Sequence, residues 1–255
     1  MPTGDAWTLR TLHFRQLWAE ADGIDFPSEF AAADARTAST GDESPGRPLA
    51  ELSEPRRAAI AALTRPLVTI AVAGLDARQP FEDPGHHRRV VSATRDMQTV
   101  IVARQELTGS VSLGGTVSIT RHTASDWTRD IVAMLPRSDG AGSLPTDTDV
   151  TFRQLPGIDA STIAVVEPPP RPSAAAAFAR DDPATCGSLR IQVGSAVDGH
   201  RPSVIEARYR DIPGDGRYLL IVDEPGVAMG VDAARFASTL NRVVNTVRRR
   251  HGEQP

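Results

Sequence analysis

The chain has 255 residues, of which 40% are hydrophobic and 24% charged, and its formal net charge at pH 7 is −4. This length can bury a sizeable core in one large domain, and the composition is typical of a globular protein. The negative charge disfavours nucleic acid as the main partner. No run approaches about 18 apolar residues, so we expect no membrane-spanning helix. Cys186 is the one cysteine, which excludes an intramolecular disulfide and favours a reducing compartment.

The first predicted element is a helix over residues 8–21. Its apolar side chains recur at helical spacing, and one face carries Phe14, Leu17, Trp18 and Ala21. The stretch before it has no basic region followed by an apolar core, so we expect no signal peptide and a cytoplasmic location.

The tract 31–48 is small, polar and interrupted by Gly and Pro, which predicts a flexible loop. A second helix is expected from about Ser53 to Leu63. Ser53 is a plausible N-cap, and Pro55 stands in the first turn, where proline is tolerated.

Apolar residues then change to an alternating period, which predicts antiparallel strands joined by short turns. In the first half we expect strands over 67–75, 88–94 and 98–105, followed by a hairpin that turns at Gly114-Gly115. A helix ending at Leu135 closes this half. The tract 137–186 is irregular and proline-rich, as in a linker.

Alternation resumes in the second half, with strands over 188–195, 203–210 and 217–224 and a tight turn at Asp215-Gly216. A short strand and an amphipathic helix from about Asp232 follow. The buried face of this helix is predicted to carry Phe236, Leu240, Val243, Val244 and Val247. The sequence thus indicates an α/β (α+β) fold in one domain over 1–255. Its two halves, 8–136 and 148–250, repeat one plan of helix, antiparallel strands and closing helix.

Several groups of residues could carry chemistry, and each has a plainer interpretation that we favour. His86 and His87 are adjacent, so in a strand they would point to opposite faces and not share a metal ion. The stretch 146–149 spaces two carboxylates like a calcium loop but lacks the Gly and distal Glu of that loop. Cys186 has no nucleophile motif around it. The arginines 248–250 suit a helix end better than a nucleic-acid site.

We therefore expect no catalytic residue, no metal and no cofactor, and a binding protein in preference to an enzyme. Neither a phosphate loop nor a nucleophile elbow is present in the sequence.

Motifs spread along the chain occur in a recognisable order. The opening stretch 7–30 has an aromatic-x-x-Leu-Trp centre, and a helix-Pro-strand junction covers 63–74, with 149–155 fitting as well. Further along come Gly187, Asp211, the run Gly216-Arg217-Tyr218-Leu219 and the helix from Asp232 to Val247. Together these resemble the EspG family, the chaperones associated with type VII (ESX) secretion in actinobacteria.

The resemblance implies a pseudo-twofold fold in which a central antiparallel β-sheet is flanked by two helical bundles. It implies a cytosolic, non-enzymatic chaperone that binds PE–PPE-like heterodimers, keeps them soluble and targets them for export. Such a protein would be a monomer or weak homodimer, with no membrane insertion and no nucleic acid.

The resemblance also places partner contacts in a loop between early strands, here residues 76–87. Phe81, between Pro80 and Pro84, would be the apolar anchor, because a semi-rigid aromatic costs little entropy to order on binding. The predicted partner-binding residues are Arg78, Gln79, Pro80, Phe81, Glu82, Asp83 and His87. The alternative is a solvated connection with Phe81 tucked into the core.

Two other functions stay open. The protein could be a type VII accessory protein that binds a different partner. It could also be a small-molecule enzyme with an unrecognised site, which would show a deep polar pocket on the sheet.

Overall fold

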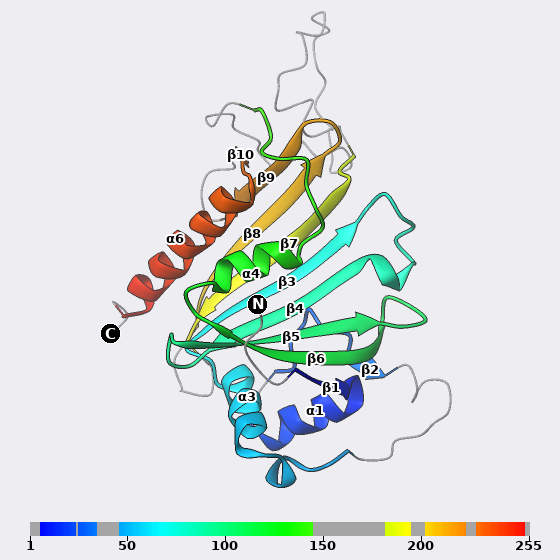
Figure 1. The fold of residues 1–255 in the computed structure, drawn as a ribbon, viewed down its shortest axis with the longest axis vertical. Coiled ribbons are helices and arrows are strands. Elements are labelled where there is room, and N and C mark those ends of the chain that lie inside the picture. Colours follow the sequence, from blue (N-terminus) through cyan, green and yellow to red (C-terminus); the bar gives the residue numbers. More distant parts are fainter. Residues whose placement is uncertain are drawn as a thin grey trace, which may run out of the picture.

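One large β-sheet organises the chain. The computed structural model describes residues 6–23, 25–34, 46–144, 182–194, 202–222 and 228–252. Within these residues, ten strands form a single sheet in the order β1-β6-β5-β4-β3-β7-β8-β9-β10, and β2 pairs with β6 beside β1. All neighbours along the main path are antiparallel, whereas β2 and β6 are parallel. Figure 1 shows the strands running from β1 at one end to β10 at the other.

Strands and helices follow one another along the chain in two groups, with α4 after β6 and α6 after β10. The strands are β1 (Trp7–Arg10), β2 (Ala33–Asp34), β3 (Val68–Asp76), β4 (His87–Thr94), β5 (Thr99–Leu107), β6 (Leu113–Thr123), β7 (Thr185–Val193), β8 (Ser203–Ile212), β9 (Gly216–Ile221) and β10 (Ala228–Gly230). The described α-helices are α1 (Thr11–Glu20), α3 (Glu54–Thr64), α4 (Trp127–Met134) and α6 (Ala233–Gly252). Two 3-10 turns, η1 (Leu49–Glu51) and η2 (Pro84–His86), complete the set that the structure describes.

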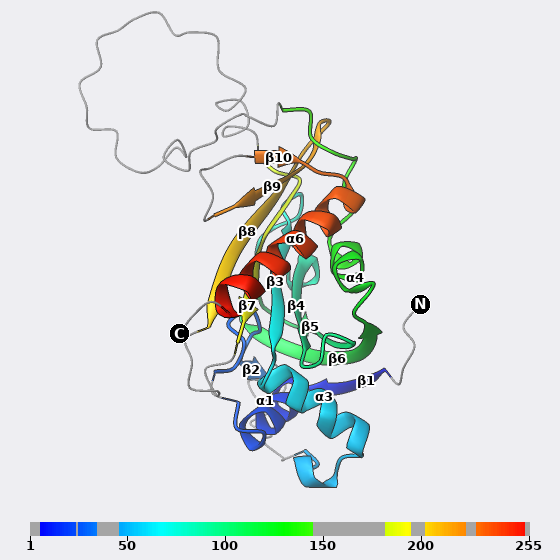
Figure 2. The same ribbon diagram turned by 90° about the vertical axis from the view of Figure 1, so that its left-hand side faces the viewer.

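The two faces of the sheet are buried by different helices, because successive strand residues point to opposite sides. Val68, Ile70 and Val72 of β3 pack in one core with α4 and α6, as their alternation predicted. The odd-numbered residues of β5 and β6, such as Ile101 and Ile119, pack in a second core with α1 and α3. Helices α4 and α6 are in contact and lie side by side in both ribbon views (Figures 1 and 2).

The expectation of two helical bundles flanking the sheet is wrong. Four α-helices among the described residues accompany a ten-stranded sheet, with α1 and α3 on one face and α4 and α6 on the other. Each face is closed by a single helical layer, because the strand side chains pack directly against one apolar stripe per helix. No helix of the described part of the chain is long and apolar enough to cross a membrane.

The helical stripes predicted from spacing are confirmed. Phe14 and Leu17 of α1 are fully buried, as are Phe236 and Leu240 of α6. Helix α3 begins after Ser53, as expected, although the Ser53 side chain makes no capping hydrogen bond.

The beginning of the chain differs from the prediction, because residues 7–10 form the edge strand β1 and the helix starts only at Thr11. Part of the predicted loop 31–48 is also a strand. Asp34 of β2 is buried, accepts a hydrogen bond from the amide of Leu12 at 3.1 Å and pairs with Arg10 at 3.0 Å. A carboxylate remote in sequence thus caps the first turn of α1. Capping motifs in the sequence do not predict it, because they consider only residues next to the helix. The remainder of the loop prediction, 35–45, lies outside the described residues.

The predicted hairpin turn at Gly114-Gly115 is also wrong. Strand β6 runs straight through both glycines, and neither has a positive φ. Gly114 is required for space, because a Cβ there would lie 2.3 Å from Thr11 Oγ1 and 2.5 Å from Gln105 Nε2. Gln105 Nε2 donates to Thr11 Oγ1 at 2.9 Å, so this buried polar link between α1 and β5 occupies the place of the side chain.

We predict that Gly114→Ala lowers the free energy of unfolding by about 1–3 kcal/mol, the usual cost of overpacking. Gly115→Ala should cost less, because its added methyl would meet the side chain of the exposed Thr108, which can rotate away. Urea unfolding of both variants measures the difference. Adding Thr11→Ala to Gly114→Ala should recover part of the loss, and equal losses at the two glycines would contradict the packing explanation.

Candidate functional site

The loop between β3 and β4, residues 77–86, holds six of the seven predicted partner-binding residues on the surface, whereas the seventh, His87, is the first residue of β4 and is buried. Residues 78–83 are all exposed, and Phe81, at 58%, is the most exposed large apolar side chain that the structure describes. The alternative of Phe81 tucked into the core is therefore excluded.

The loop is nevertheless held in one shape by local contacts. His87 is buried, its Nε2 lies 2.8 Å from the carbonyl oxygen of Phe81, and the two rings meet edge to face at 5.2 Å. Asp83 accepts from the amide of Gly85 at 3.0 Å and lies 3.1 Å from His86 Nε2. The two adjacent histidines thus make separate contacts within this part of the chain.

The first residues of the loop are fixed by an ion pair. Arg78 donates through Nε and Nη2 to the two oxygens of Asp76, at 2.9 and 2.8 Å. The hydrogen bonds from the Arg78 side chain, together with one from the Arg78 backbone amide, hold the pKa of the Asp76 carboxyl below its usual value. The amides of Gln79 and Asp83 donate to the carbonyls of Asp76 and Pro80. Glu82, the residue after Phe81, is exposed as well.

A buried ion pair that the sequence patterns did not predict lies on β8 and β9, at the same end of the sheet as the loop. Arg217 and Asp211 are 4% and 5% exposed, and Arg217 donates to both Asp211 oxygens at 2.6 Å. A third bond from Arg217 goes to the carbonyl of Pro136 at 2.6 Å, and Thr185 donates to Asp211. The guanidinium lies 5.1 Å from the ring centroid of Tyr209.

The run Gly216-Arg217-Tyr218 is therefore structural, as its hairpin position suggested. Gly216 and Gly214 have positive φ, of 140° and 72°, as the turn requires. The Tyr218 hydroxyl accepts from the amide of Leu144 at 2.9 Å and donates to Asp215. Burial raises the pKa of Tyr218, and the bond to Asp215 acts in the same direction.

A second polar array joins β6 to α4. Thr120 Oγ1 lies 2.9 Å from His122 Nε2, and His122 Nδ1 lies 2.6 Å from Asp130 Oδ2. Hydroxyl, imidazole and carboxylate follow one another in the order of a nucleophile, a base and its orienting acid. Thr120 and His122 are two residues apart on a strand and share a face, which was the one available sequence signal.

The other candidates from the sequence do not gather into a site. Cys186 is partly buried, and burial raises the pKa of its thiol, which lowers the thiolate fraction. Arg248 and Arg249 are exposed near the end of α6. Among the residues described, no three His, Cys, Asp or Glu side chains are placed to hold a metal ion. The acidic stretch 146–149 lies outside the described residues.

No protein-family model matches this sequence, and no curated protein is significantly similar to it.

We predict that Arg217→Met lowers the free energy of unfolding by about 3–5 kcal/mol, because it leaves Asp211 as an unpaired buried charge. Arg78→Met removes an equally well-formed pair from the exposed loop and should cost much less, because solvent screens the two charges. Urea unfolding compares the two variants. The double variant Asp211→Leu/Arg217→Met should lose less than Arg217→Met alone, and a larger loss would show that the pair itself stabilises the fold.

Proposed function

We propose that this protein is a cytosolic, non-enzymatic chaperone that binds a helical partner of the PE–PPE type and delivers it to type VII (ESX) secretion. The observation that carries the proposal is the exposed ring of Phe81 on an ordered loop at the end of β3 and β4. The choice of partner rests on the sequence motifs that resemble the EspG family. The exposed loop coincides with the residues to which that resemblance assigns partner contacts.

The contacts around Phe81 favour binding because an ordered loop loses little conformational entropy when a partner binds. The carbonyl of Phe81 is already bonded to His87, and the ring already rests against the His87 imidazole. A preorganised anchor converts more of its buried area into affinity than a mobile one. An apolar helical tip could cover the free face of the ring, which would otherwise stay in water.

Charges around the ring would select the partner. Glu82 and Asp83 follow Phe81 in the chain and are exposed, whereas Arg78 is already paired with Asp76. A basic or polar residue flanking an apolar tip would suit this rim better than an acidic one, since like charges across an interface oppose association. The same surface could serve a type VII accessory protein with a different helical partner, which is the alternative within this class.

We predict that Phe81→Ala weakens binding to a PE–PPE-like heterodimer at least about tenfold, as expected for an aromatic anchor worth 1.4 kcal/mol or more. Co-expression followed by size exclusion, and calorimetry on the purified partners, measure the effect. Leu67→Ala is the matched control, because Leu67 is an exposed apolar residue (38%) at the other end of β3.

A complex that tolerates Phe81→Ala would keep the chaperone function and refute the loop as its site. Absence of any complex with PE–PPE-like pairs would instead favour a different partner.

A second candidate function is nucleophilic catalysis at Thr120, favoured by the array Thr120–His122–Asp130. The imidazole could accept the hydroxyl proton through Nε2 while Asp130 holds Nδ1. The same bonds also fasten α4 to β6, so the array has a structural use without any chemistry.

A fluorophosphonate probe separates these two roles. Catalysis predicts a covalent adduct at Thr120, detected by mass spectrometry, that is lost in His122→Ala. A protein that stays unlabelled but melts at a lower temperature after His122→Ala would refute catalysis and assign the array to the fold.

A further inference from the structure

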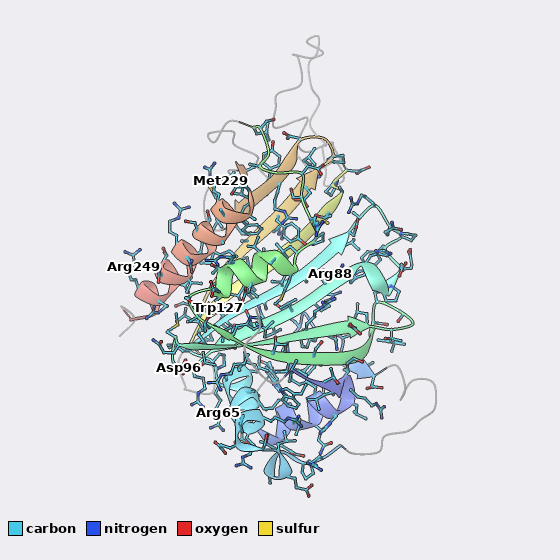
Figure 3. The ribbon with its side chains drawn as sticks, in the orientation of Figure 1. Arg65, Arg88, Asp96, Trp127, Met229 and Arg249 are labelled. Carbon is cyan, nitrogen blue, oxygen red and sulfur yellow. The ribbon has the colours of Figure 1, made fainter. Side chains whose placement is uncertain are left out.

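A cleft at the far end of β4 from the Phe81 loop has features of a ligand site. It lies between the first turns of α3 and the ends of β1, β5 and β6, and its cavity volume is about 510 Å³. This size is within the range of small-molecule pockets. Figure 3 labels Asp96, one of its lining residues, at the end of the sheet above α3. The eight residues of β4 separate the cleft from the loop by about 25 Å.

The floor of the cleft is apolar and belongs to rigid elements. Trp7 of β1, Ile101 of β5 and Ile119 of β6 line it, and all three are less than 9% exposed. Ala59 and Ala62 of α3 form the facing wall with small side chains. The cleft is therefore lined by apolar side chains on both sides.

The rim of the cleft carries three arginines, Arg56, Arg95 and Arg121. The Arg56 guanidinium lies 5.1 Å from the ring centroid of Trp7, and Arg121 donates to Thr99 Oγ1 at 3.2 Å. Within the described part of the chain, none of the three forms an ion pair. Three guanidinium groups thus border one cleft with their charges largely uncompensated.

The one carboxylate in the lining, that of Asp96, is already hydrogen-bonded to backbone amides. Asp96 Oδ1 accepts from the amides of Gln98 and Thr99 at 2.8 and 2.9 Å, closing the turn between β4 and β5. These backbone bonds hold the pKa of Asp96 below its usual value, so it stays ionised. Even with this charge counted, the cleft keeps a net positive charge of two from three arginines and one aspartate.

We propose that this cleft binds a small organic carboxylate with an apolar body, the carboxylate on the arginine rim and the body on the Trp7 floor. Guanidinium groups recognise carboxylates through paired N–H donors, and two or more arginines can share one such group. An inorganic anion would satisfy the rim but would make no use of the apolar lining. A neutral apolar molecule would fill the floor but leave the rim charges unmatched.

The proposal is independent of the chaperone function, because the two sites share no residue. A small ligand is favoured over a polypeptide because the apolar floor is confined between α3 and the sheet. The end of a peptide chain presents the same chemistry, and the experiment below distinguishes it.

Calorimetry with 4-phenylbutyrate as the probe tests the site. We expect saturable binding, at least about tenfold weaker for the neutral 4-phenylbutyramide and for acetate, which lacks the apolar body. Arg121→Gln and Arg56→Gln should each weaken 4-phenylbutyrate binding about tenfold. Arg129→Gln is the matched control, because Arg129 is an exposed arginine on α4 outside the cleft, and it should bind as the parent protein does.

Equal binding of the acid and the amide, no saturable binding, or an equal loss in Arg129→Gln would overturn the proposal. Thermal unfolding of each variant establishes that the fold is intact. A peptide ending in a free phenylalanine carboxylate that binds much more tightly than 4-phenylbutyrate, and needs Arg121, would overturn the small-molecule assignment in favour of a chain terminus.

Discussion

The buried pair Asp211–Arg217 is the interaction on which the second half of the molecule depends. Its two members face each other in register across β8 and β9, and the guanidinium also reaches the carbonyl of Pro136 after α4. The ring of Phe236 in α6 lies 6.0 Å from the same guanidinium. One charged group therefore fixes a hairpin, the segment after α4 and the first turns of α6. Moving any of these elements away would leave a buried charge without its partner, which is strongly unfavourable.

The same ion pair is linked through Tyr209 to the pairing of β3 with β7, where the two halves of the sheet meet. Arg217 lies over the ring of Tyr209, and the Tyr209 ring extends across Gly187 of β7 to Gly74 of β3. A Cβ on Gly187 would be 2.6 Å from that ring, and one on Gly74 would be 2.4 Å from its hydroxyl. The paired glycines are therefore a consequence of packing a large aromatic ring flat on the sheet, and the strand pairing β3–β7 depends on them.

Sequence patterns predicted the elements well where side chains act within one element, and poorly where they act between elements. The apolar stripe on α6 could be predicted from the spacing alone, because all its apolar residues pack into the same core. Gly114 was misread as a turn, because the Thr11 and Gln105 side chains that exclude a Cβ come from elsewhere in the chain. The pairing of Arg217 with Asp211 could have been predicted by counting residues outward from the β8–β9 turn, because this count places the two residues opposite each other. The exposure of Phe81 had no such signal, because loops bury or expose aromatics according to tertiary contacts.

These constraints bear on function because the Phe81 loop starts from the same row of residues. Asp76, at the end of β3, lies opposite Thr185 of β7, which lies opposite Asp211 of β8 and then Arg217 of β9. The amide of Ala77 donates to the carbonyl of Ala184, which ties the first residue of the loop to this row. The first residue of the loop is thus tied by strand pairing to the same row of residues that contains the buried ion pair.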